Sequence, residues 1–130
     1  AYSCTECGRC SSVCPANQTG KLLSPRKIMM DTRDRIEVIG NSKEQDNNYL
    51  LGNYITKEEL WACTTCNACT DACPINLDPL SIIVDLRRYL VMEESAAPTE
   101  LNNMFSNVEN NGAPWQFPAA DRLKWLDEKD

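Results

Sequence analysis

Eight cysteines in this 130-residue chain form two groups of four with identical spacing. The stretch CTECGRCSSVCP occupies residues 4–15 and CTTCNACTDACP occupies residues 63–74, so each group has the pattern C-x2-C-x2-C-x3-C-P. Histidine is absent from the sequence, which removes the commonest general base and the commonest nitrogen ligand of metals. Sulfur chemistry is therefore the most concentrated chemistry that these residues offer.

Three kinds of site could use cysteines in this pattern. A disulfide framework is typical of small secreted domains with too little core, whereas a chain of this length can bury a core of its own. A zinc ion needs four ligands, for which two C-x2-C pairs would suffice. Each run here carries a third and a fourth cysteine, and the complete pattern is the bacterial-type ligand run for a [4Fe–4S] cluster. The spacing therefore favours iron–sulfur clusters over zinc or disulfides.

The fourth cysteine of such a run ligates the other cluster in two-cluster proteins. The repeat then has a physical reason, because neither run completes a site alone, and the prolines that close the two runs turn the chain away after the last cysteine. The sequence predicts two [4Fe–4S] clusters as cofactors, with Cys4, Cys7, Cys10 and Cys73 holding cluster 1 and Cys63, Cys66, Cys69 and Cys14 holding cluster 2. No residue is predicted to be catalytic.

The net charge of −6 and a pI near 4.7 argue against nucleic acid as a partner, since phosphate binding requires a basic surface. Eight thiolates and two oxidised cluster cores would bring the charge to about −10. We therefore expect a redox partner with a basic docking face. The apolar runs are far shorter than the roughly 20 residues that cross a bilayer. We expect a cytoplasmic location, with any membrane association provided by a longer parent protein.

The elements that must position the cysteines are predicted to be helices. Ser24-Pro25 and Asp78-Pro79 each read as an N-cap followed by the first helical residue, and residues 56–59 form a capping box. Alternation of the kind that marks strands does not stand out. We expect a mostly α fold in which two cluster-binding loops, each followed by a helix, are arranged with pseudo-twofold symmetry.

The sequence also suggests a division of the chain. Residues 1–95 contain both cysteine runs and the helices around them, and we expect them to form the dicluster domain. Residues 96–130 are predicted to be a helical extension leading towards a downstream module outside this sequence. We expect the chain to be part of a longer protein.

At this level of detail the chain resembles a known family. The paired cysteine runs, the long helical spacer and the stretch NLDPLSIIVDLRRYLV at 76–91 resemble the α-helical ferredoxin domain of heterodisulfide-reductase-type iron–sulfur subunits. The iron–sulfur subunits of glycolate oxidase and anaerobic glycerol-3-phosphate dehydrogenase are similar. Residues 107–125 resemble the N-x-x-N-P-W-G segment that follows this domain, with Ala113 before Pro114-Trp115 and Gln116 in place of the glycine.

The resemblance implies electron relay between a flavin site and a module rich in cysteine pairs, a quinone or a disulfide. We therefore expect one-electron transfer through the two clusters, as part of a larger oxidoreductase, from a domain that is not catalytic alone. The alternative is a structural or interaction domain that zinc or a labile cluster stabilises.

Two arginine positions add smaller signals. Arg9 lies inside the first run where the second has Ala68, and a cation there would raise the reduction potential of cluster 1, since local charge is one determinant of that potential. A solvated surface arginine is the alternative. The pair Arg87-Arg88 fits either a docking site or an ordinary solvated helix face.

Overall fold

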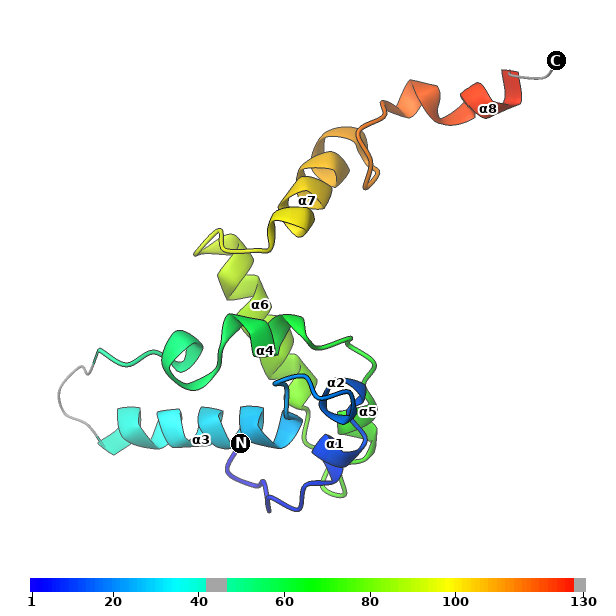
Figure 1. The fold of residues 1–130 in the computed structure, drawn as a ribbon. Coiled ribbons are helices and arrows are strands. Elements are labelled where there is room, and N and C mark those ends of the chain that lie inside the picture. Colours follow the sequence, from blue (N-terminus) through cyan, green and yellow to red (C-terminus); the bar gives the residue numbers. More distant parts are fainter. Residues whose placement is uncertain (42–46, 128–130) are drawn as a thin grey trace. The chain divides into compact units, whose positions relative to one another are not determined.

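The computed structural model of the chain describes residues 1–41 and 47–127 and is built from helices (Figure 1). Within these residues there is no β-strand, only an isolated bridge between Leu51 and Ile55. The expected mostly α fold is confirmed. The elements in chain order are α1 (Arg9–Ser12), α2 (Pro15–Gln18), α3 (Pro25–Asn41), the irregular turn η1 (Leu50–Tyr54), α4 (Lys57–Trp61), α5 (Ala68–Asp71), α6 (Pro79–Met92), α7 (Thr99–Asn111), the 3-10 turn η2 (Ala119–Leu123) and α8 (Lys124–Asp127).

The chain divides into two compact units, residues 1–89 and 90–130, with the boundary inside α6. Both cysteine runs belong to the first unit. No helix of the described residues has both the length and the apolar character that crossing a bilayer requires. The assignment of residues 96–130 to an extension that leads towards a downstream module stays a prediction.

All three predicted helix starts in the first unit are present. The Ser24 hydroxyl accepts a hydrogen bond from the Lys27 backbone N–H at 3.4 Å as α3 begins. At α4 the capping box is complete, because the Thr56 hydroxyl accepts from the N–H of Glu59 while the Glu59 carboxylate accepts from the N–H of Thr56. At α6 the Asp78 carboxylate accepts from the N–H of Ser81 at 3.1 Å. These caps satisfy N–H groups that a helix end otherwise leaves without partners.

The core of the first unit lies next to the cysteine runs. The short helices α1 and α5, one from each run, contact each other, and α1 also contacts α2 and α3 (Figure 1). Cys14 and Cys69 are themselves buried. The sequence pattern predicts an apolar face on α3 formed by Ile28, Met29, Ile36 and Val38, but Ile36 is exposed. The side chains buried in this core are Leu23, Pro25, Ile28, Met29, Ile55, Leu60, Pro79 and Ile83.

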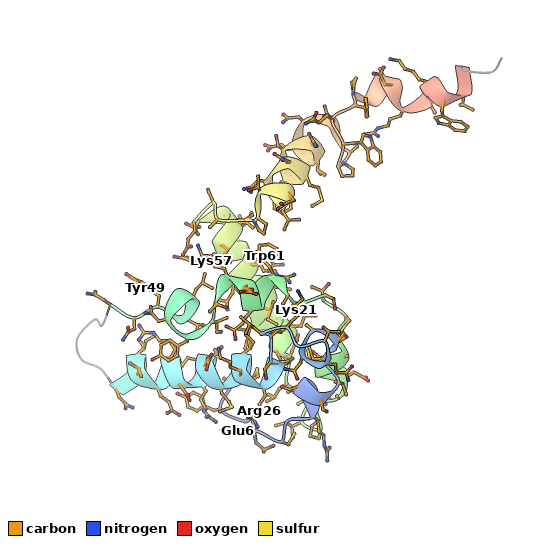
Figure 2. All side chains as sticks on the ribbon, in the orientation of Figure 1. Glu6, Lys21, Arg26, Tyr49, Lys57 and Trp61 are labelled. Atoms are coloured by element: carbon orange, nitrogen blue, oxygen red, sulfur yellow. The ribbon has the colours of Figure 1, made fainter. Side chains whose placement is uncertain are left out.

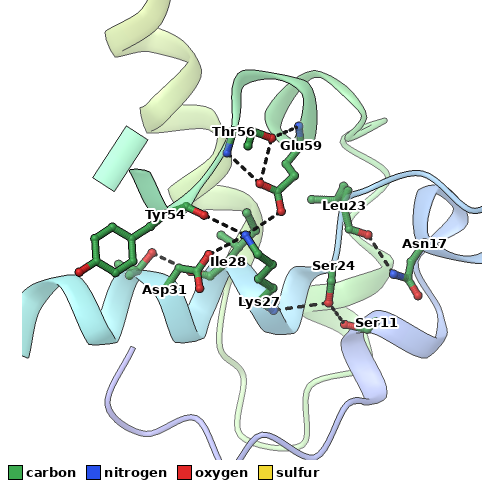
Figure 3. Close-up of polar contacts among 11 residues, drawn as sticks. Ser11, Asn17, Leu23, Ser24, Lys27, Ile28, Asp31, Tyr54, Thr56 and Glu59 are labelled. Atoms are coloured by element: carbon green, nitrogen blue, oxygen red, sulfur yellow. Dashed lines mark hydrogen bonds and ion pairs between the residues drawn. The ribbon is translucent and has the colours of Figure 1, made fainter. Parts of the chain in front are cut away.

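A lysine joins the helix that follows the first run to the helix that precedes the second (Figure 3). The Lys27 ammonium on α3 lies 2.8 Å from the carboxylates of Asp31 and Glu59 and donates to the carbonyl of Tyr54 at 2.9 Å. Glu59 is 4% exposed. Its burial favours a raised pKa, but Lys27 and the hydrogen bonds from Thr56 outweigh burial and hold the pKa of Glu59 below its ordinary value. This contact therefore sets how α4 lies against α3.

In the second unit, residues 107–125 comprise the end of α7, the bend that follows it, η2 and the start of α8. Gly112 adopts a left-handed conformation (φ 65°) at the helix end, as is common for glycine there. The Asn107 side chain donates to the Pro114 carbonyl at 3.0 Å, and Arg122 donates to the Asn111 carbonyl at 2.7 Å. These bonds close the segment that resembles the family motif.

Replacing Lys27 with methionine should destabilise the first unit. The buried Glu59 carboxylate would lose its cation, at a cost of about 1–2 kcal/mol, less than for a fully buried pair because the lysine side chain is 43% exposed. The midpoint temperature of anaerobic unfolding, followed by circular dichroism, should fall by roughly 5–10 °C. Lys21→Met removes an exposed lysine and serves as the control. Equal midpoints for the two variants would contradict this role of Lys27.

The same ion pair predicts a pH dependence. Because the pKa of Glu59 is lower in the folded than in the unfolded chain, the pair stabilises the fold fully above the unfolded-state pKa. That contribution is lost as the pH falls through the folded-state pKa. The gap in unfolding midpoint between wild type and Glu59→Gln should thus be widest near neutral pH and narrow on acidification. The exposed neighbour Glu58→Gln is the control, and a pH-independent gap for Glu59→Gln would count against the assignment.

Candidate metal centre

The two cysteine runs share an unusual backbone. Glu6 (φ 57°) and Gly8 (φ 81°) lie in the left-handed region, and so do Thr65 (φ 56°) and Asn67 (φ 66°) at the matching places in the second run. Left-handed residues are strained for all but glycine and cluster where a loop wraps a ligand. Such loops turn successive N–H groups towards one side, a backbone form that recurs at iron–sulfur sites. Both runs are therefore wound as ligand-binding loops.

Backbone N–H groups also point at two of the sulfur atoms. The N–H of Leu77 donates to Cys73 Sγ at 3.2 Å, and the N–H of Thr65 donates to Cys63 Sγ at 3.4 Å. Such hydrogen bonds stabilise negative charge on sulfur and are one determinant of cluster potential. Bonds of this kind thus reach cysteines of both predicted sets.

The cysteines line two cavities, each with sulfur from both runs. The first, cavity 1, has an empty volume of about 390 Å³ including space open to solvent, and the second, cavity 2, has about 320 Å³. In each case three cysteines of one run meet the fourth cysteine of the other. Cavity 1 is lined by Cys4, Cys7, Cys10 and Cys73, and cavity 2 by Cys63, Cys66, Cys69 and Cys14. The structure thus brings together the two predicted sets, whose role as ligands stays a prediction.

The cysteine side chains are all reduced and differ in environment. All eight have free thiols. Burial raises the pKa of the Cys10 and Cys69 thiols, whereas a backbone hydrogen bond from Ala68 lowers the pKa of the exposed Cys66 thiol. Four thiols around one cavity fit a cubane with one thiolate on each iron, while zinc needs its sulfur ligands about 2.3 Å from one point. Among the described side chains, no three of His, Cys, Asp or Glu are grouped as they would be around a single metal ion.

Comparison with known protein families matches residues 1–77 to the 4Fe-4S dicluster domain. The chain belongs to this family. Two [4Fe–4S] clusters are therefore its cofactors, as the cysteine spacing predicts.

Relatives of this dicluster domain occur in larger redox proteins. The "Probable iron-sulfur-binding oxidoreductase FadF" of Bacillus subtilis is 34% identical over 98% of this chain and 23% of its own length. The "EtfAB:quinone oxidoreductase" of Syntrophomonas wolfei is 33% identical over 98% of the chain and 21% of its own length. One subunit of the ferredoxin/F(420)H(2)-dependent CoB-CoM heterodisulfide reductase of Methanosarcina acetivorans is 33% identical over 74% of the chain and 50% of its own length. The predicted likeness to heterodisulfide-reductase-type iron–sulfur proteins is confirmed, and the chain spans less than a quarter of the first two relatives.

An arginine of α6 fixes the entry to the second run. The Arg87 guanidinium donates to the Leu60 carbonyl at 3.0 and 2.5 Å and to the Cys63 carbonyl at 2.6 Å, and lies 4.9 Å above the ring centre of Trp61. It thereby caps the last turn of α4 and holds the peptide of a cysteine that lines cavity 2. Arg88, in contrast, is exposed and pairs with Asp85 on the surface.

This role of Arg87 differs from both expectations for the Arg87-Arg88 pair, a docking site and a solvated helix face. A signal for it is nevertheless present. Arg87 stands four residues after Ile83 and three before Leu90, so it shares the helix face of two fully buried residues. Position on the helix distinguishes it from Arg88.

We expect Arg87→Met to loosen the second cysteine run. Two carbonyl groups would lose a charged donor, costing about 2–3 kcal/mol, and the cluster that Cys63 is predicted to hold should be released faster. In an iron-chelator assay on the holoprotein, about half of the iron should leave in an accelerated phase. Arg87→Lys should rescue only partly, because an ammonium cannot reproduce the fork of the guanidinium. Arg88→Met is the matched control, and equally fast release from it would refute the positioning role.

Proposed function

We propose that this dicluster domain relays single electrons through two [4Fe–4S] clusters as part of a larger oxidoreductase. The observation that carries the proposal is the composition of the two cavities, since each contains three cysteines of one run and the fourth of the other. Cluster 1 would be held by Cys4, Cys7, Cys10 and Cys73, and cluster 2 by Cys63, Cys66, Cys69 and Cys14.

The clusters supply the one-electron chemistry, and the chain positions them. Because each run contributes sulfur to both sites and α1 contacts α5, the two clusters are kept close together. The hydrogen bonds to Cys63 and Cys73 Sγ stabilise negative charge at each site. Cys7 and Cys66 are the exposed members of the two sets and mark the edges where electrons would enter and leave. The domain needs no proton donor and is not expected to turn over a substrate alone.

The lining of the cavities supports the pseudo-twofold arrangement. Leu77 and Pro79, which follow the second run, line cavity 1, while Leu23 and Pro25, which follow the first run, line cavity 2. Each cluster would thus be enclosed by its own run and by the start of the helix that follows the other run.

The parent protein would place the relay between two redox sites. The names of the relatives include a quinone, ferredoxin and a heterodisulfide. We infer a flavoprotein partner and a cysteine-rich downstream domain, towards which residues 96–130 lead. Given the acidic charge of the holo-domain, the docking face of a partner would be basic. The relay would work in the cytoplasm or, through its parent protein, at a membrane.

Metal analysis after anaerobic purification tests the relay. We expect about eight irons and eight sulfides per chain, and a paramagnetic signal on reduction with dithionite. Stoichiometric zinc without sulfide would support the alternative, a metal-stabilised structural or interaction domain.

The exchange of fourth cysteines can be tested by pairing variants. If the ligands cross as proposed, Cys14→Ser and Cys66→Ser damage the same cluster, and Cys73→Ser and Cys7→Ser damage the other. The paramagnetic spectra of the reduced variants should therefore match within each pair and differ between pairs, with about half of the iron retained. If Cys14→Ser instead matches Cys7→Ser, each run holds its own cluster and the crossed assignment is wrong.

A further inference from the structure

We propose that the cluster 1 site has the higher reduction potential, so that a single electron in the domain resides there. The proposal rests on the proposed relay and adds to it an internal direction. Its basis is a difference in charge between the two cavities. Three charged residues, Glu6, Arg9 and Arg26, line cavity 1, whereas no charged residue lines cavity 2.

The two cysteine runs provide matched positions at which the charges of the two cavities can be compared. Relative to the cysteines, Thr65 stands in the place of Glu6 and Ala68 in the place of Arg9. Arg26 directly follows the proline that begins α3, and Leu80 directly follows the proline that begins α6. Both of these residues line the cavity of their own run. Two sites with the same cysteine pattern therefore differ at matched positions by charged side chains.

The carboxylate at cavity 1 has a cation of its own. Glu6 lies 2.8 Å from the guanidinium of Arg33 on α3, which also contacts Asp34 at 3.3 Å. Within residues 1–41 and 47–127, the side chains of Arg9 and Arg26 take part in no ion pair. Two arginine charges at cavity 1 are thus left without a nearby carboxylate partner, while the one carboxylate is paired.

Arg26 lies at the start of α3 (Figure 2), and a backbone hydrogen bond holds it there. Its N–H donates to the Ser11 hydroxyl at 3.2 Å. This hydroxyl is hydrogen-bonded to that of Ser24 at 2.8 Å (Figure 3). The start of α3 is therefore tied to α1, the helix that contains Cys10. Arg26 emerges from this junction beside the cavity that its own run lines.

Reduction adds one negative charge to a cluster, and nearby cations favour the reduced form. Arg9 and Arg26 are both exposed, so water and salt screen their effect without removing it. N–H to sulfur bonds reach cysteines of both predicted sets, whereas cationic side chains line only cavity 1. Arg87 adds positive charge near cluster 2, but it is bound to the Leu60 and Cys63 carbonyls and lies outside the lining of cavity 2.

An internal direction follows from this difference. If one electron passes from cluster 2 to cluster 1, cluster 2 is oxidised, cluster 1 is reduced and no proton moves. The arginines favour this transfer over its reverse. An electron that enters near Cys66 therefore comes to rest at the site whose exposed cysteine is Cys7.

The test converts cavity 1 to the composition of cavity 2. In the holo-domain, Arg9→Ala/Arg26→Leu should lower the higher of the two reduction potentials and leave the lower one in place. We expect about a tenfold change in the distribution of one electron between the sites, which is about 59 mV for a one-electron couple. The measurement is a dithionite titration followed by paramagnetic resonance. The shift should shrink as salt is added, and Arg26→Lys, which keeps the charge, should retain most of the wild-type value.

Matched variants separate this effect from general charge loss. Arg88→Leu removes an exposed arginine that lines neither cavity and should move neither potential. Leu80→Arg places the missing cation at cavity 2 and should raise the lower potential. Because two nearby clusters repel each other's electrons, their potentials differ even at identical sites. The test therefore depends on how each reduction potential changes on substitution, and not on the difference between the two potentials in the wild type.

The outcomes distinguish this inference from the relay on which it rests. If the wild type contains zinc without sulfide, both are wrong. If two clusters titrate and the double arginine variant, with its iron and sulfide intact, moves neither potential or only the lower one, the relay stands and the internal direction is wrong. Should that variant lose a cluster, Arg26→Gln against Arg26→Lys decides in the same way.

Discussion

A [4Fe–4S] cluster requires four thiolates, and a tight loop with cysteines at steps of three presents only three of them to one side. The fourth must come from another part of the chain, and here each cavity is lined by one cysteine of the other run. Cavity 1 takes Cys73 from the second run and cavity 2 takes Cys14 from the first. Completing each set of four thiolates therefore constrains the fold. The two runs must lie next to each other even though most of the first unit separates them in the sequence.

Two sets of polar contacts hold the segment between the runs so that both runs reach the same part of the first unit. Its helix α3 leads away from the first run, and the chain must return through α4 to deliver Cys63. Lys27 holds the outgoing and returning helices together through Glu59, and Arg87 holds the end of α4 from the helix that follows the second run. Apolar residues such as Ile28 and Leu60 are fully buried in the same unit. The polar contacts determine orientation, and the apolar ones supply most of the burial.

Local signals in the sequence were sufficient for the start of each major helix in the first unit and for the grouping of cysteines. Both depend on short-range chemistry, namely caps such as Thr56 with Glu59 and the fixed spacing of a ligand run. The functions of Lys27 and Arg87 depend on which distant backbone groups come within reach, and an isolated sequence does not contain those distances. Ile36 failed as a core residue for the same reason, because helical periodicity selects a face without showing whether anything packs on it.

A repeated motif would by itself make two nearly equal electron sites. Equal sites share an electron evenly, and a relay between unlike partners then has no internal preference. In a pair of cavities with the same cysteine pattern, a difference must come from the filler between and after the cysteines, where the two runs diverge. The residues between and after the cysteines can vary without loss of the cysteine pattern, so they can give one half of the repeat a property that the other half lacks. Such a difference is present here, because the first half has Arg9 and Arg26 where the second has Ala68 and Leu80. Both arginines line cavity 1, where they would stabilise the negative charge that reduction adds.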